Sequence, residues 1–228
     1  MIRFVLLDLD DTILDFHRAE AAAVSKTFLR LGIEPTEQLV QRYSEVNAAH
    51  WRMLERGEIS RAQVLTGRFR QLFSEIGADC NPELTQQIYE AHLSQGHYFI
   101  PGAEQMLEDL HGNYQLYLVS NGNAVVQKGR LESAGIAPYF DAIFISELIG
   151  ADKPSKAYFD RCFAIIPDFN PGQAILIGDS PTSDILGGIH AGVKTCWFNP
   201  NHRLPHPEIH ADYEIDQLCL IPSLLASL

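Results

Sequence analysis

Residues 2–12 read IRFVLLDLDDT. A short apolar run of β-forming residues ends here in a group of acids, which predicts a buried strand with Asp8 and Asp10 at its carboxyl end. Two carboxylates at such a place can divide the work of a reaction, one attacking and the other handling a proton. Taken alone, the stretch is also consistent with an ordinary turn, because Asp favours turns.

The segment that follows has a different character. Residues 17–95 are rich in Ala, Glu, Gln and Arg at helical spacing, and Gly and Pro residues interrupt them. This pattern predicts four helices. We expect them near residues 17–31, 36–56, 61–76 and 83–95.

From residue 101 apolar strands and helices alternate. Strands are predicted near 115–120, 142–145, 174–178 and 193–197, and helices near 102–111, 124–134, 155–165 and 181–191, with a last strand and helix within 212–226. Alternation of this kind predicts a parallel sheet with helices on both faces. We therefore expect an α/β fold, with a doubly wound, Rossmann-like core from residues 1–15 and 97–228. We expect residues 16–96 to form an α-helical domain inserted after the first strand.

The bulk composition limits the partners. The chain has 228 residues, 46% of them hydrophobic, and a net charge of −12. Such an acidic surface repels nucleic acids and anionic membranes, so we expect neither as a partner. A phosphorylated small molecule would also be repelled, so its site needs a local cation from a metal or a lysine.

The cysteines and the N-terminal sequence bear on the cellular compartment that we expect for the protein. The four cysteines are scattered and form no CxxC pair, which favours reduced thiols. The apolar run at the N-terminus is too short for a signal peptide, and no stretch of 18 apolar residues follows. We expect a cytoplasmic protein that is a monomer or a homodimer.

Three further groups of polar residues follow predicted strands. Ser120, Asn121 and Gly122 offer a hydroxyl and backbone N–H groups to phosphate oxygens. Lys153 stands just before a proline-started helix, a suitable place for binding an anion. Asp179 supplies an oxygen ligand of the kind that Mg²⁺ prefers, and Asp184 lies about one turn into the next helix.

Each group alone is also typical of a turn or a solvated surface, but their combination is more specific. The carboxyl ends of parallel strands meet at one edge of the sheet, where open α/β folds bind ligands. We therefore expect all four groups to converge there.

With these residues, the chain resembles the haloacid dehalogenase superfamily of aspartate-nucleophile hydrolases. The motifs are DLDDT (8–12), SNG (120–122), DKP (152–154) and GDSPTSD (178–184), in the family's order. The resemblance covers essentially the whole chain. It implies a Mg²⁺-dependent phosphatase with a helical cap that closes over a small phosphorylated metabolite.

The resemblance also implies a role for each motif residue. Asp8 would be the nucleophile, and Asp10 the acid and then the base, while Ser120 and Lys153 would hold the phosphoryl group. Metal ligands would come from Asp8, Asp179 and the carbonyl of Asp10, with Asp184 supporting the metal's water shell. Thr12 would support the first loop, and Asn121 and Gly122 would lie beside the substrate. An acid at position 10 favours phosphatase over dehalogenase chemistry, because an alkoxide needs a proton donor and a halide does not.

Longer strings resemble the YjjG-type pyrimidine 5′-nucleotidases. They are VNAAHW (46–51), GRF (67–69), ISELIGADKP (145–154), and DILGGIHAG with TCWFNPNHR within 184–203. This resemblance implies a nucleoside 5′-monophosphate such as deoxyuridine or thymidine monophosphate. The residues expected to select the base are Phe16, Asn47, Trp51 and Arg68.

Other functions remain open on the residues alone. They are a phosphatase for sugar phosphates or phosphoglycolate, a phosphomutase, a 2-haloacid dehalogenase, a phospho-accepting signalling module and a non-catalytic nucleotide binder. Receiver modules are about half this length and lack a helical insert. His202, His206 and His210 lie in a Pro-rich loop and do not indicate a zinc site.

Overall fold

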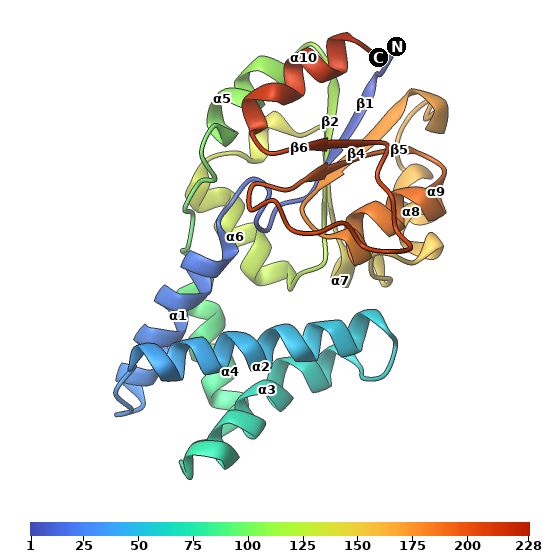
Figure 1. The fold of residues 1–228 in the computed structure, drawn as a ribbon. Helices are drawn as coiled ribbons and strands as arrows, with labels where there is room; N and C mark the ends of the chain where they lie inside the picture. The colour runs from blue at the N-terminus through green and yellow to red at the C-terminus, as the bar shows by residue number, and fades with distance from the viewer.

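The computed structural model describes all 228 residues, and a six-stranded parallel sheet lies at its centre (Figure 1). The spatial order is β3-β2-β1-β4-β5-β6. The strands are β1 (Phe4–Leu7), β2 (Gln115–Ser120), β3 (Ala142–Ile145), β4 (Ala174–Gly178), β5 (Lys194–Phe198) and β6 (Tyr213–Ile215). The N-terminal strand thus lies between β2 and β4, each in parallel register with it.

Alternate residues of each strand enter two hydrophobic cores, because successive side chains point to opposite faces. Val5 and Leu7 belong to the core beneath α5 (Ala103–Leu110), α6 (Ala124–Ala134) and α10 (Ile221–Ala226). Phe4 and Leu6 belong to the core beneath α8 (Lys156–Phe163). The predicted doubly wound α/β core, with helices on both faces of a parallel sheet, is confirmed.

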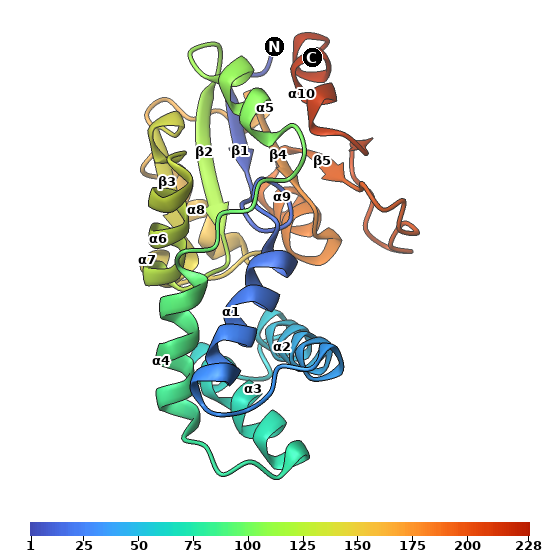
Figure 2. The same ribbon diagram turned by 90° about the vertical axis from the view of Figure 1, so that its left-hand side faces the viewer.

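Four helices lie between β1 and α5 and form a separate body, which we call the cap (Figures 1 and 2). They are α1 (Phe16–Arg30), α2 (Glu37–Glu55), α3 (Arg61–Ile76) and α4 (Pro82–Leu93). Each begins at a side-chain N-cap, and these caps are Asp15, Thr36, Ser60 and Asn81. Such caps satisfy backbone N–H groups that a helix start leaves without partners. The helix boundaries follow the sequence-based prediction to within about two residues at each end.

The cap has its own hydrophobic core, centred on stacked aromatic rings. Tyr43 and Phe69 stack with centroids 5.1 Å apart, and Tyr89 packs against both. Val126 of α6 joins this core, so the cap rests on one helix of the α/β body. The chain termini lie together at the end of the molecule opposite the cap (Figure 1).

One predicted helix divides into two pieces. Residues 181–191, predicted as one helix, form a π-helical turn, Pro181–Ile185, followed by α9 (Leu186–Ala191). The backbone N–H groups of Asp184 and Ile185 both donate to Ser180 O, at 2.9 and 3.2 Å. This wide turn directs the Asp184 carboxylate back to the start of the loop, where it accepts a hydrogen bond from Ser180 N. Single π turns of this kind are frequent at functional sites.

The remaining elements are short. They are the helix α7 (Ser146–Ile149) and 3₁₀ turns at Ala137–Tyr139, Pro171–Gln173 and Leu218–Leu220. None of the helices combines the length and the apolar character needed to cross a bilayer. The division into residues 1–15 and 97–228 against 16–96 stays a prediction.

Candidate active site

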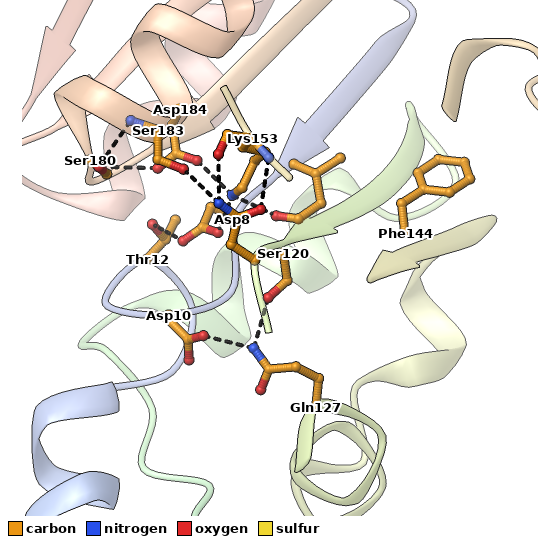
Figure 3. Close-up of polar contacts among 12 residues, drawn as sticks. Asp8, Asp10, Thr12, Ser120, Gln127, Phe144, Lys153, Ser180, Ser183 and Asp184 are labelled. Atoms are coloured by element: carbon orange, nitrogen blue, oxygen red, sulfur yellow. Dashed lines mark hydrogen bonds and ion pairs between the residues drawn. The ribbon is translucent and has the colours of Figure 1, made fainter. Parts of the chain in front are cut away.

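The carboxyl ends of β1, β2 and β4 lie at the edge of the sheet that faces the cap (Figure 1), and polar side chains gather at these ends (Figure 3). Asp8 directly follows β1, Ser120 ends β2, and Asp179 directly follows β4. These strands are hydrogen-bonded neighbours, so residues far apart in the chain become neighbours in space.

Lys153 lies at the centre of this group. Its ammonium donates to Asp8 Oδ1 at 2.6 Å, to Asp184 Oδ1 at 2.7 Å and to the carbonyl of Val119 at 2.9 Å. Asp8, Asp184 and Lys153 are all buried. Charge-assisted hydrogen bonds in a buried setting are among the strongest polar contacts in proteins, so the ammonium fixes both carboxylates firmly.

Burial and charge together shift the pKa values of this group. Burial, opposed by the Lys153 ammonium, raises the pKa of Asp8 well above its ordinary value. Burial and then the Asp184 carboxylate raise the pKa of Asp179 to about 7. Burial alone would lower the pKa of Lys153, but the carboxylates of Asp184 and Asp8 raise it above its ordinary value. The site therefore holds several acidic side chains close together, with too little positive charge nearby to balance them.

The crowded acids fit a divalent metal ion. One carboxylate oxygen each from Asp8, Asp179 and Asp184 lies within 4.8 Å of the others. The positive charges in contact with them are Lys153 and the half-exposed Arg203, which reaches Asp179 Oδ2 at 3.2 Å. Oxygen ligands of this kind suit Mg²⁺, whose charge would relieve the repulsion between the acids.

Glycine at position 178 is required for this arrangement. A Cβ atom there would overlap the carboxylate of Asp184. Any other residue at the end of β4 would push this side chain away from Lys153.

Asp10 belongs to a second set of contacts beside the first. Gln127 of α6 donates from one Nε2 atom to Asp10 Oδ2 and to Ser120 Oγ, both at 2.7 Å (Figure 3). Arg130 of the same helix forms an ion pair with Asp10 Oδ1 and donates to the carbonyl of Gly96, where the chain returns from the cap. The buried side chains of Gln127 and Arg130 thus hold the Asp10 carboxylate in place and leave the hydroxyl hydrogen of Ser120 free to donate.

The loop after β2 closes tightly on α6. A Cβ atom on Gly122 would lie 2.6 Å from the Gln127 side chain. Asn121 is engaged with the neighbouring loop, because its Nδ2 donates to Lys153 O and its Oδ1 accepts from Lys153 N, both at 2.8 Å. On the other side, Thr12 Oγ1 donates to Asp8 Oδ2 at 3.3 Å. Asn121 and Thr12 therefore orient Lys153 and Asp8.

A cavity of about 410 Å³ joins this group to the cap. Phe16, Asn47, Trp51 and Arg68, the four cap residues singled out in the sequence, all line it. Asn47 and Arg68 are buried and hydrogen-bonded to each other at 2.5 Å. The guanidinium of Arg61 lies over the ring of Trp51, with its Cζ atom 5.5 Å from the ring centroid. The volume is in the range of small-molecule sites.

Sequence reasoning missed several residues of the site. Gln127 and Arg130 lie inside a helix, and their only signal is a spacing of three, which puts them on one face. Glu20 and Gln86 come from the first and the last of the cap helices, α1 and α4, and nothing local in the sequence marks them. Their place in the site depends on how the cap helices pack.

Comparison with known proteins agrees with this geometry. The family model described as haloacid dehalogenase-like hydrolase matches residues 5–198. The protein YfnB of Bacillus subtilis is 41% identical over 95% of this chain and 92% of its own. A crystal structure of YfnB bound to magnesium, described as revealing interdomain movement, aligns with a TM-score of 0.94 at 40% identity and covers 98% of both chains.

Two more relatives carry the name pyrimidine 5′-nucleotidase. PynA of Streptococcus pneumoniae is 35% identical over 93% of this chain and 90% of its own. YjjG of Escherichia coli is 30% identical over 97% of both chains. The resemblance seen in the sequence motifs is confirmed, and the chain belongs to the haloacid dehalogenase-like hydrolase family.

Proposed function

We propose that this protein is a Mg²⁺-dependent phosphatase that cleaves small phosphomonoesters through an aspartyl phosphate on Asp8. The observation that carries the proposal is the Lys153 ammonium, which contacts both Asp8 and Asp184 beside Asp179. Asp8 as nucleophile, Lys153 as fixed cation and the three acids as a metal site would then act together at one point of the cavity.

In the first step, a carboxylate oxygen of Asp8 attacks phosphorus. An Asp8 O–P bond forms while the bond from phosphorus to the leaving oxygen breaks, and Asp10 gives its proton to the departing alkoxide. The charge of Lys153 and the Ser120 hydroxyl stabilise the equatorial phosphoryl oxygens. Asp10 supports phosphate chemistry over dehalogenation, because an alkoxide leaving group needs a proton donor and a halide does not; Gln127 and Arg130 fix the position of Asp10.

In the second step, water attacks phosphorus of the aspartyl phosphate. Asp10, now a carboxylate, accepts the proton, the Asp8 O–P bond breaks, and inorganic phosphate leaves. Forming the covalent intermediate divides one difficult displacement into two easier ones.

Asp8, Asp179 and the main-chain carbonyl of Asp10 would hold Mg²⁺, with Asp184 supporting its water shell. The bound ion would neutralise charge between the Asp8 carboxylate and a phosphate dianion, which otherwise repel each other. The crystal structure of YfnB bound to magnesium supports a magnesium site in this protein.

The substrate we propose is a nucleoside 5′-monophosphate with a pyrimidine base. PynA and YjjG, both named pyrimidine 5′-nucleotidases, support it. The cavity adds a structural reason, because its lining includes the acid cluster, polar side chains of the cap and the aromatic rings of Phe16 and Trp51. A phosphate, a sugar and a planar base would find suitable partners among them.

We also propose that residues 16–96 act as one domain that closes over the body formed by 1–15 and 97–228. Arg61 of α3 supports this, since it donates to Gly122 O at 3.0 Å and Ser146 Oγ at 2.6 Å and forms an ion pair with Asp152. These contacts cross from the cap to two loops of the site. The interdomain movement described for YfnB also supports closure of the cap over the body.

Phosphate release across a substrate panel tests the function. The panel contains pyrimidine and purine nucleoside monophosphates, sugar phosphates, phosphoglycolate and p-nitrophenyl phosphate, each with Mg²⁺ and with excess chelator. We expect release from pyrimidine nucleotides at the highest kcat/KM and none in chelator. Undiminished release in chelator would contradict the metal assignment, and a preference for sugar phosphates would contradict the substrate.

A further inference from the structure

The cap end of the cavity contains a buried chain of polar side chains centred on Arg68. Arg68 donates to Asn47 Oδ1 at 2.5 Å and to Gln86 Oε1 at 2.7 Å. Each carboxamide then donates to a glutamate, Asn47 to Glu20 at 2.6 Å and Gln86 to Glu90 at 2.7 Å. Members of this chain come from all four cap helices, and all five line the cavity.

Some hydrogen-bonding groups at this place are unused. Arg68 Nε and the hydroxyl of Tyr89 are buried and have no partner. Glu20 Oε1 accepts from Asn47, and the two carboxylate oxygens have further lone pairs that can accept a hydrogen bond. Buried polar groups are rarely left unpaired, so unused donors beside a cavity indicate a ligand that completes them.

The charge at this end of the cavity argues against a second anionic group on the ligand. Two glutamates, Glu20 and Glu90, belong to the polar chain, against one arginine, Arg68. A carboxylate or second phosphate would meet excess negative charge here. A neutral polar ring meets no such repulsion.

We propose that Glu20 and Arg68 are specificity-determining residues that bind the imide edge of a base, with its two carbonyls around one N–H. The Glu20 carboxylate accepts the ring N–H, and Arg68 Nε and the Tyr89 hydroxyl donate to the carbonyls. This inference rests on the proposed function and specifies its substrate as a uracil or thymine nucleotide. Cytosine fits less well, because its ring nitrogen at the same position carries a lone pair that faces the carboxylate.

The hydrogen bond that Glu20 accepts from Asn47 makes Glu20→Gln an informative test of this proposal. Its oxygen must still accept from Asn47 Nδ2, so the amide NH₂ would point to the ligand. The position would then donate where the wild type accepts, which disfavours the N–H of uracil and favours the lone pair of cytosine.

The experiment measures kcat/KM for uridine and cytidine 5′-monophosphates in wild type, Glu20→Gln and the control Glu37→Gln, an exposed glutamate on α2. We expect the ratio of uridine to cytidine turnover to fall at least about tenfold in Glu20→Gln and to stay at the wild-type value in the control. If Glu20 had only a structural role, the substitution would lower kcat/KM equally for both substrates. The ratio would then stay unchanged, and this result would overturn the proposal.

A substrate analogue tests the same contact without a mutation. Wild-type protein should lose at least about tenfold in kcat/KM on 3-methyluridine 5′-monophosphate relative to uridine 5′-monophosphate, because the methyl group replaces the N–H. Equal turnover of the two would contradict the inference. If wild type also releases no phosphate from p-nitrophenyl phosphate, the proposed function itself fails; if it does release it, only the base recognition fails.

Discussion

The two ends of the cavity each surround one buried cation, but with different partners. Lys153 contacts carboxylates directly, Asp8 and Asp184. Arg68 contacts two carboxamides, and the glutamates lie one step further away. A compact ammonium between acids sets up a strong local field, whereas a planar guanidinium between amides provides fixed hydrogen-bond geometry. The first arrangement suits phosphoryl transfer, and the second suits recognition of a neutral ring.

The largest expected effect comes from Asp8→Asn. The amide retains the shape of the side chain but removes the nucleophile, so phosphate release should fall by at least about ten thousandfold. Circular dichroism should show an unchanged fold. Near-normal turnover in this variant would mean that another residue attacks phosphorus.

Lys153→Met removes the ammonium that produces the strong local field beside Asp8 and Asp184, and leaves the other residues of the site unchanged. It leaves Asp8 and Asp184 buried without their shared cation, and removing one partner of a buried ion pair costs about 3–5 kcal/mol. Turnover should fall by about a hundredfold or more on every substrate, because the phosphoryl group loses a fixed positive charge. Denaturant unfolding and kcat/KM measure the two effects, and a loss confined to nucleotides would contradict the assignment.

Arg68→Met gives the matching change at the other end of the cavity. Its direct partners are neutral amides, so the loss of unfolding free energy should be smaller than for Lys153→Met, about 1–3 kcal/mol. Nucleotide turnover should fall more than turnover of p-nitrophenyl phosphate, which has no base to recognise. If both substrates lose activity in proportion, the contrast between the two ends of the cavity is wrong.

The smallest effect concerns the pH dependence of stability. Burial raises the pKa of Glu20 above 4.5, so above pH 4.5 the unfolded chain gives up this proton more readily than the folded one. The contribution of Glu20 to stability is therefore present below pH 4.5 and is lost as pH rises through the folded-state pKa. In Glu20→Gln, the unfolding free energy should fall less steeply with pH above 4.5 than in wild type, as urea titrations at several pH values would show. An identical slope would mean that Glu20 is not desolvated.

The α/β core and the motif positions could be predicted because their signals are local. An apolar run followed by Asp8, or by Asp179, marks a strand end directly, and parallel strands bring such ends together. The wide turn at 181–185 could not be predicted, since it depends on the two bonds to Ser180 O rather than on periodicity.

The cap network was only half predicted, for a different reason. Asn47 and Arg68 were singled out from strings resembling a known family, and the structure adds that they bond to each other. Glu20 and Gln86 carry no pattern of their own, because a buried Glu on an amphipathic helix looks like any surface Glu until its neighbours are placed. Arg130 likewise looks like a surface residue of α6, yet it is fully buried against Asp10.

Identifying the phosphorylated residue tests the central claim most directly. Wild-type protein in Mg²⁺ would be mixed with substrate, quenched in acid within milliseconds and reduced with borohydride, which converts an aspartyl phosphate to homoserine. Tryptic peptides would then be sequenced by mass spectrometry; residues 4–18 form the peptide that contains Asp8, Asp10, Asp11 and Asp15. Our account predicts homoserine at position 8 alone. Homoserine at another aspartate, or at none while substrate is being consumed, would contradict it.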